Sequence, residues 1–202
     1  MRIPLIGIAL IAGAAMTANA QSRAILAPAS KMWIEGTSNV HDWKVEANNI
    51  DAQIELDAAG LAAAPAKMVK KVTITIPVKS LKSEHDKMDD NIRKALKADK
   101  YAEIVYTLTS VESVSAETKD GFTLKTAGTL NIAGVENAVS SEIVAIRLAD
   151  GTIKATGSVP VKMTAFQVKP PTAMFGTIKC GDEVKVKFDF VVGPKVIAAN
   201  DK

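Results

Sequence analysis

The sequence predicts an all-β protein, an antiparallel sandwich or barrel of short strands joined by tight turns. Three observations support this class. Apolar and polar residues alternate along most of the chain, glycine-containing turn sequences separate the alternating segments, and one segment alone has helical spacing. Alternation with a period of two places apolar side chains on one face of a strand, but it does not distinguish a barrel from a sandwich.

Composition excludes several functional classes. The 202 residues include 25 Lys and Arg against 22 Asp and Glu, and this near balance argues against a nucleic-acid-binding protein. One cysteine excludes a disulfide framework, and one cysteine with two histidines is too few for a structural zinc site of four such ligands. The length suits a single domain with a substantial core.

Residues 1–20 have the features of a cleaved signal peptide. Arg2 precedes an apolar run over 3–15, and Ala18, Asn19 and Ala20 fit the small-x-small cleavage rule. The run is short for a membrane span, although a retained N-terminal anchor is the alternative. We therefore expect a periplasmic or secreted protein. The expected organisation is a signal peptide at 1–20, an N-terminal arm at 21–30, one β domain at 31–193 and a tail at 194–202.

The alternating segments and their turns follow one another in a regular order. In the segment 72–76, for example, Val72, Ile74 and Ile76 alternate with threonines. Strands are expected at 50–56, 72–76, 104–108, 129–132, 153–163 and 184–190. Turns are expected at Asp120 and Gly121, Ala133 and Gly134, Asp150 and Gly151, and Cys180, Gly181 and Asp182.

One segment, near residues 88–98, predicts a short amphipathic α-helix. Met88, Ile92 and Leu96 recur every four positions, and acidic residues at its start and basic residues at its end suit the helix dipole. Such a helix would lay its apolar stripe over an opening in the β structure. A plain connector helix that caps the core is the alternative.

Catalytic motifs are absent from the sequence. It contains no G-x-S-x-G elbow, no Gly-rich phosphate loop and no H-E-x-x-H helix. Ser38, His41 and Asp42 resemble parts of a triad, but neighbouring strand residues point to opposite faces, which disfavours cooperation. We therefore expect no enzymatic activity.

A metal site has a weak basis in the sequence. His41, His85, Asp86 and Asp89 supply nitrogen and oxygen ligands, but their spacing does not require convergence, and solvated acids are the alternative. We expect neither a metal nor a cofactor. The unpaired Cys180 is expected in a turn without a function, and a homodimer stays open.

Several segments together resemble the YceI-like family of exported lipid-binding proteins. Trp33, Ile34 and Glu35 lead to Ser-Asn-Val-His-Asp-Trp at 38–43. The other matching segments are 72–81, 89–93, 96–101, 104–106, 128–135 and 161–169. The resemblance spans about 33–192. After Tyr101, where the family usually has a small residue and a proline, this chain has Ala102 and Glu103. The segment 38–43 also differs from the family's commoner His-containing strand. Both differences suggest a divergent subgroup.

The resemblance implies an extended, antiparallel, lipocalin-like barrel with a helix and a long apolar channel. It further implies non-covalent binding of an isoprenoid-type or other amphiphilic lipid. The residues expected to line the channel are Trp43, Ile74, Ile76, Tyr106, Leu108, Leu130, Ile132, Phe166, Phe188 and Phe190. Met88, Ile92 and Leu96 are expected to gate its mouth. Each of these side chains suits an ordinary core equally well.

Two functions remain open from the sequence. The first is a non-catalytic carrier that sequesters the lipid in an apolar channel. The second is a periplasmic stress-response or interaction module whose barrel is packed and binds no lipid. A hollow interior would favour the first, and a filled interior would favour the second.

Overall fold

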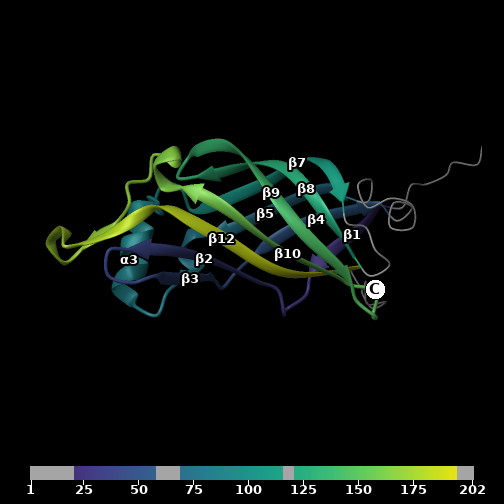
Figure 1. The fold of residues 1–202 in the computed structure, drawn as a ribbon, viewed down its shortest axis with the longest axis horizontal. Helices are drawn as coiled ribbons and strands as arrows, with labels where there is room; N and C mark the ends of the chain where they lie inside the picture. Colours follow the sequence, from purple (N-terminus) through teal and green to yellow (C-terminus); the bar gives the residue numbers. More distant parts are fainter. Residues whose placement is uncertain (1–20, 58–68, 116–120, 195–202) are drawn as a thin grey trace, which may run out of the picture.

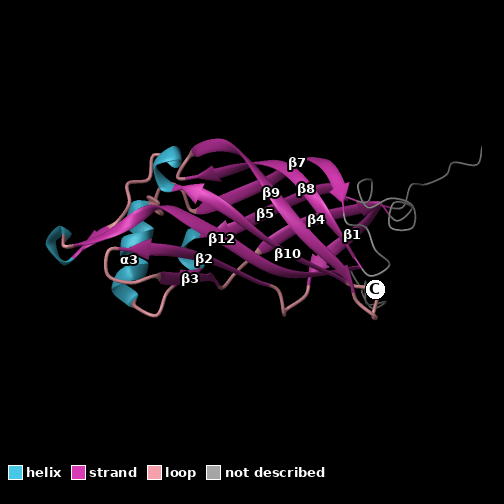
Figure 2. Cartoon of the chain, in the orientation of Figure 1, coloured by secondary structure: helices cyan, strands magenta, loops and turns pink. Residues whose placement is uncertain are grey.

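The computed structural model describes residues 21–57, 69–115 and 121–194. The expected signal peptide, Asp120 of one expected turn and residues 195–202 of the expected tail lie outside them. The described chain forms one antiparallel sheet closed into an eight-stranded barrel, and it contains one short α-helix (Figures 1 and 2). The all-β prediction is confirmed, and of its two forms the structure is the barrel.

Twelve strands, one α-helix and three short 3-10 helices make up the described chain. The strands are β1 (Gln21–Leu26), β2 (Lys31–Ser38), β3 (Trp43–Ala47), β4 (Asp51–Asp57), β5 (Val69–Pro77), β6 (Leu81–Lys82), β7 (Glu103–Ser115), β8 (Gly121–Ile132), β9 (Val135–Arg147), β10 (Ile153–Lys162), β11 (Thr172–Ala173) and β12 (Ile178–Pro194). The helices are η1 (Val78–Ser80), α3 (Asp86–Ala95), η2 (Met163–Phe166) and η3 (Met174–Gly176).

Strand β12 closes the barrel. The wall runs β1-β4-β5-β7-β8-β9-β10-β12, and the end of β12 pairs with β1, where Leu26 lies opposite Val192. The middle of β12 pairs with β2, where Val184 lies opposite Gly36. Strands β3 and β6 then follow β2, so the wall continues toward the helix α3. This end, with α3 across it, is called the α3 end below (Figure 1).

Residues 21–30, expected to form an arm outside the domain, contain a strand of the barrel wall. β1 lies between β4 and β12, and Ala24 is buried. Between β1 and β2 the chain stays attached to β12, because Ala27 N–H and the Ser30 hydroxyl bond the Val191 carbonyl. The strand was missed because the polar residues at its start hide any alternation.

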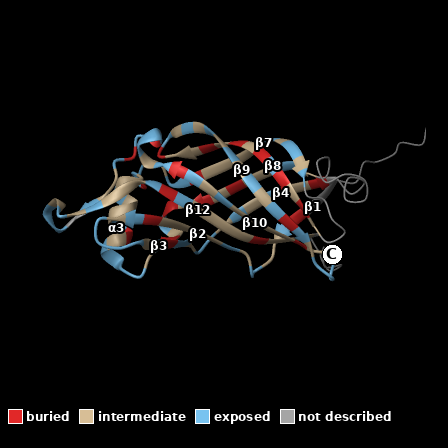
Figure 3. Cartoon of the chain, viewed as in Figure 1, coloured by how far each residue is buried: buried red, intermediate tan, exposed pale blue. Residues whose placement is uncertain are grey.

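The barrel interior receives alternate side chains from every long strand. In β8, Phe122, Leu124, Thr126, Gly128 and Leu130 are buried, whereas the residues between them are more exposed. Buried residues form two clusters, one that includes Val78 and Leu81 and one that includes Phe122 and Ile153. Buried segments lie along the length of the barrel (Figure 3). The apolar alternation seen in the sequence therefore faces inward.

Two of the expected turns are confirmed and one is wrong. Ala133 and Gly134 both have positive φ, as a type I′ hairpin turn requires, and Gly151 has φ +83° in the β9–β10 turn. The segment from Cys180 to Asp182 is instead a bulge within β12, where the register against β2 shifts. Gly181 serves close packing here, because a Cβ at this position would lie 2.6 Å from Thr37 Oγ1.

The predicted helix is confirmed, with slightly earlier bounds. It begins at Asp86, with His85 as N-cap, and its last helical residue is Ala95. Lys97 has φ +53°, Lys97 N–H bonds Lys94 O, and Ala98 N–H bonds Arg93 O. These bonds form a Schellman cap, which ends the helix before residue 98.

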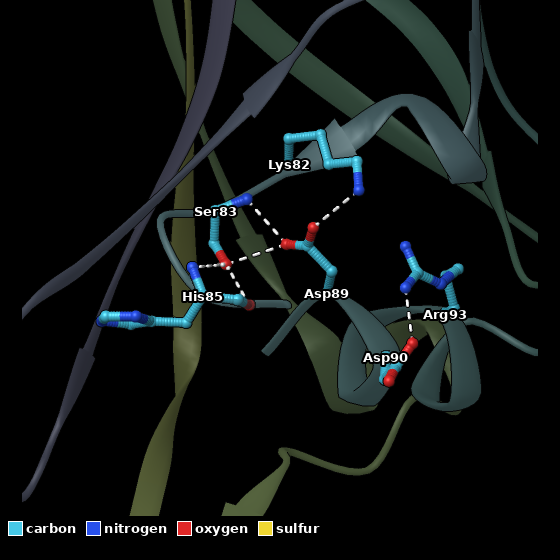
Figure 4. Close-up of polar contacts among 6 residues, drawn as sticks. All are labelled: Lys82, Ser83, His85, Asp89, Asp90 and Arg93. Atoms are coloured by element: carbon cyan, nitrogen blue, oxygen red, sulfur yellow. Dashed lines mark hydrogen bonds and ion pairs between the residues drawn. The ribbon is translucent and has the colours of Figure 1, made fainter. Parts of the chain in front are cut away.

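Asp89 fixes the start of α3 to β6. Its side chain is 1% exposed, and its carboxylate accepts hydrogen bonds from Ser83 N (2.7 Å) and Ser83 Oγ (2.8 Å) (Figure 4). Lys82 Nζ lies 3.0 Å from the other oxygen. Burial raises the pKa of this carboxyl, but the Ser83 hydrogen bonds and the Lys82 ammonium outweigh it, and the pKa lies below the ordinary aspartate value. The solvated role considered for Asp89 is therefore wrong.

We expect Asp89→Asn to lower the free energy of unfolding by about 2 kcal/mol at neutral pH, because charge-assisted bonds at a buried site are lost. Since the pKa of Asp89 is lowered in the fold, its contribution is present above the unfolded value of about 4 and disappears as the pH falls through the folded value. Urea titrations of both proteins across the acid range measure the difference.

The matched control is Asp90→Asn. Asp90 is exposed and pairs with Arg93 on the helix surface, so its loss should cost less than about 0.5 kcal/mol (Figure 4). The anchoring role would be contradicted if both substitutions lowered the free energy of unfolding equally. It would also be contradicted if the loss caused by Asp89→Asn persisted at acid pH.

Candidate apolar binding cavity

A cavity of about 740 Å³ occupies the barrel interior. Its volume lies within the range of small-molecule sites. It extends from Phe122 and Ile153 to Met88 and Ile92 of α3. Ten residues of β8 separate Phe122 from Ile132, both on its wall, so a rise of about 3.4 Å per residue and the usual strand tilt give a length of about 25 Å. The barrel is therefore hollow, and its hollow is elongated.

All ten side chains that were expected to line the channel lie on the wall of this one cavity. Residues from β3, β5, β7, β8, η2 and β12 surround it. They are Trp43, Ile74, Ile76, Tyr106, Leu108, Leu130, Ile132, Phe166, Phe188 and Phe190. Half of them are buried, whereas Trp43, Tyr106, Leu108, Ile132 and Phe188 keep part of their surface accessible. Contact of these side chains with a ligand stays a prediction.

Helix α3 lies across one end of the cavity. Its Met88 and Ile92, together with Leu96 just after its last residue, line the cavity and pack against the buried cluster that includes Leu81. Polar residues of the same helix, Lys87 and Asn91, also reach the lining. The apolar spacing predicted the first three, whereas no sequence pattern indicated the other two.

The mouth of the cavity lies between α3 and the loop 39–42. His41, Trp43, His85 and Met88 border both the cavity and a polar groove on the outside of β2, β3 and β6, so the groove adjoins the cavity there. Acidic and basic side chains line the groove. They are Glu35, Asp42, Lys44, Glu46, Lys82, Glu84, Glu183 and Lys185. The apolar interior therefore has a charged rim beside it at this end.

Ser38 and His41 shape the loop at the mouth. The Ser38 hydroxyl accepts from Val40 N and His41 N and donates to the His41 carbonyl at 2.7 Å. The His41 ring nitrogen Nδ1 lies 2.8 Å from the Asp42 carbonyl, so the tautomer with a proton on Nδ1 fits. The hydroxyl and the imidazole are thus both bonded to backbone, and the triad-like arrangement is not formed.

Trp43 rests on a strand glycine at the mouth. Its Nε1 donates to the Thr37 carbonyl at 3.0 Å, and its ring covers Gly36 so closely that a Cβ there would lie 2.1 Å from ring carbon Cζ2. Sequence analysis missed Gly36. A glycine within a strand is the signal that could have found it, because it often marks close approach of another group.

A small group of hydroxyls interrupts the apolar lining midway along the barrel. Thr126 is buried, and its Oγ1 lies 2.7 Å from Ser141 Oγ. The side chains of Tyr106 and Thr126 are also hydrogen-bonded to each other. Burial raises the pKa of Tyr106, and the Thr126 bond acts in the opposite direction. The phenol ring lies over Gly128, where a Cβ would be 2.5 Å from it. The interior therefore offers neutral hydrogen-bonding groups at this level, and sequence analysis found only Tyr106.

The described residues contain no group of three or more His, Cys, Asp and Glu placed to hold a metal ion. Of the four ligands considered from the sequence, Asp89 is bonded to Ser83 and Lys82, Asp86 is exposed at the start of α3, and His41 and His85 border the mouth. No helix within the described ranges is long and apolar enough to cross a membrane.

A closed antiparallel barrel around one long apolar cavity defines a barrel binding protein. The sequence of residues 25–192 matches the YceI-like domain, and the chain belongs to the YceI-like family. The resemblance noted from the sequence is thereby confirmed. No curated protein matches the chain in sequence.

Solved structures share the fold at low sequence identity. BcnA from Burkholderia cenocepacia has a TM-score of 0.64 and 20% identity, over 81% of this chain and 96% of that chain. A polyisoprenoid-binding domain from Saccharophagus degradans, implicated in plant cell wall breakdown, has a TM-score of 0.63 and 14% identity, over 86% and 99%. The YceI protein from Campylobacter jejuni has a TM-score of 0.53 and 21% identity, over 75% and 84%.

We expect Gly36→Ala to displace the Trp43 ring from the mouth, because the added Cβ overlaps it. In a Trp33→Phe background, Trp43 is the one remaining tryptophan and its emission reports the displacement. Overpacking should also lower the free energy of unfolding by about 1–3 kcal/mol.

Gly193→Ala is the control, since its Cβ would meet a Thr152 methyl group at 3.2 Å and no aromatic ring. Unchanged Trp43 emission in Gly36→Ala would show that the ring does not depend on the glycine.

Proposed function

We propose that this protein sequesters or carries an isoprenoid-type or other long-chain amphiphilic lipid in its barrel, without catalysis. The observation that carries the proposal is the elongated apolar cavity with a charged rim. Membership of the YceI-like family and the fold shared with a polyisoprenoid-binding domain support it.

The apolar tail of the lipid would occupy the interior. The wall is mostly aliphatic, with a few aromatic rings such as the stacked pair Phe188 and Phe190, whose centroids are 4.9 Å apart. Such a surface suits a flexible chain, because each CH₂ group removed from water contributes about 0.8 kcal/mol. The hydroxyls of Tyr106, Thr126 and Ser141 would offer a hydrogen bond to a polar group within the chain.

The polar end of the lipid would lie at the mouth, beside the groove. Charged side chains of both signs border it, and His41 and His85 stand where the groove adjoins the cavity. Helix α3 would act as the gate through Met88, Ile92 and Leu96, with its start held by Asp89 and its end by the Schellman cap. Methionine suits a gate, since its unbranched side chain adapts to different shapes.

The same proposal includes export. A lipid that crosses an aqueous compartment needs its apolar surface covered, and residues 1–20 have the sequence of a cleaved signal peptide. We therefore propose a periplasmic or secreted carrier. The alternative, an interaction module with a packed barrel, fits poorly with an interior that holds a cavity of about 740 Å³.

Native mass spectrometry of the exported protein tests the proposal. The expected result is a stoichiometric mass excess that organic extraction identifies as one isoprenoid or acyl species, and the same spectrum reports a homodimer if one forms. A bare mass that persists after incubation with isoprenoid lipids would overturn the carrier function.

We expect Ala155→Phe to weaken binding of a fluorescent fatty acid by about tenfold or more. Ala155 lines the cavity, and a phenyl ring there occupies space equivalent to at least two CH₂ groups of ligand. Ala138→Phe is the matched control, because Ala138 is exposed on the outer face of β9. Equal binding by the two variants, both folded by circular dichroism, would place the probe outside the cavity.

A further inference from the structure

A hairpin projects from the barrel at the α3 end. It comprises residues 172–178, from β11 through η3 to the start of β12, and is called the tip hairpin here. In Figure 1 it lies furthest out along the long axis, beyond α3. Its Phe175 side chain is 112% exposed and Met174 is 67% exposed. The most protruding point of the described chain is therefore apolar.

The backbone of the tip hairpin holds these side chains outward at a cost. Met174, Phe175 and Gly176 have φ of +50°, +58° and +88° in succession. The left-handed region is rarely adopted by a bulky residue such as phenylalanine, and such outliers concentrate at functional sites. Packing against the described part of the chain does not account for the conformation of Phe175, because this residue is fully exposed.

The tip hairpin is firmly tied to the mouth. The Asn39 side chain donates to the Thr177 carbonyl at 2.9 Å and accepts from Lys179 N at 2.8 Å. Asn39 belongs to the loop at the mouth, and the next residue, Val40, is 61% exposed. Met174 and Ile178 also line the cavity. The exposed apolar residues thus share one end of the protein with the opening of the cavity.

The segment that contains the tip hairpin carries basic and no acidic side chains. From 168 to 181 the sequence contains Lys169 and Lys179 and no acidic residue. Both lysines are exposed, and neither side chain forms an ion pair within the described ranges. An apolar tip flanked by unpaired lysines is complementary to an anionic lipid surface, where aromatic side chains insert below the headgroups and lysines attract the phosphates.

We propose that the tip hairpin docks this protein on anionic phospholipid bilayers, with Phe175 and Met174 inserted and Lys169 and Lys179 at the phosphates. A convex tip at the far end of the long axis reaches a flat bilayer before any other part of the described chain, whereas a protein partner would need a matching pocket. Docked in this way, the mouth of the cavity faces the bilayer. The docking extends the proposed carrier function but does not require a ligand in the cavity.

Sedimentation with vesicles tests the proposal. The mature protein should bind vesicles of phosphatidylcholine and phosphatidylglycerol and bind pure phosphatidylcholine vesicles more weakly. Phe175→Ser should lower the affinity about tenfold or more, and each of Lys169→Gln and Lys179→Gln about fivefold. Controls are Val144→Ser, an exposed apolar residue on β9, and Lys125→Gln on β8.

Phe175→Trp gives a second, direct measurement. The emission of the added tryptophan, taken as the difference from the parent protein, should shift to the blue on addition of the anionic vesicles. Absence of vesicle binding, binding undiminished by Phe175→Ser, or an unshifted difference emission in Phe175→Trp would overturn the proposal. So would a dimer that Phe175→Ser dissociates without any vesicle binding. The fatty-acid assay on the same variants reports the cavity separately, so failure of docking is distinguishable from failure of the carrier function.

Discussion

The structure depends above all on the pairing of both edges of β12. One edge pairs with β10 from Ile153 to Lys162, and the other pairs in turn with β2 and β1. Closure removes the free edges and encloses an apolar face that an open sheet would leave in water. Because the same edge of β12 pairs first with β2 and then with β1, the sheet continues beyond the closed barrel through β2, β3 and β6. That extension carries the loop 39–42 and α3, and so creates a mouth at one end.

Features with a local period were predictable from the sequence. Alternation identified the inward residues of β5 and β12, and the four-residue spacing of Met88, Ile92 and Leu96 located the helix. The family resemblance then selected a barrel over a sandwich, which periodicity could not do. The membership of β1 in the wall and the bulge at Gly181 were not predictable. Both depend on residues distant in sequence, such as Val192 opposite Leu26 and Thr37 beside Gly181.

The difference between local sequence patterns and contacts between distant segments also applies to the site, which has an apolar lining and a set of polar groups. Its apolar lining consists largely of inward-facing strand residues, so alternation together with the family resemblance indicated ten of the residues that line the cavity. Its polar groups acquire their roles from partners on other segments: Asp89 from Ser83 and Lys82, and Thr126 from Ser141 and Tyr106. Nor does a sequence of Met, Phe and Gly indicate three left-handed residues in succession, because Met and Phe ordinarily avoid that region.

The incompletely covered lining has a consequence for the lifetime of the protein. Leu108, Ile132 and Phe188 retain accessible surface inside the barrel, and the unfolded chain has no cavity at all. Any molecule that fills the space therefore binds the native state selectively, and a hundredfold excess over its dissociation constant adds about 2.7 kcal/mol to the free energy of unfolding. An empty barrel spends a larger fraction of its time open to proteases than a filled one. Under the proposed carrier function, the abundance of the protein would therefore follow the supply of its ligand.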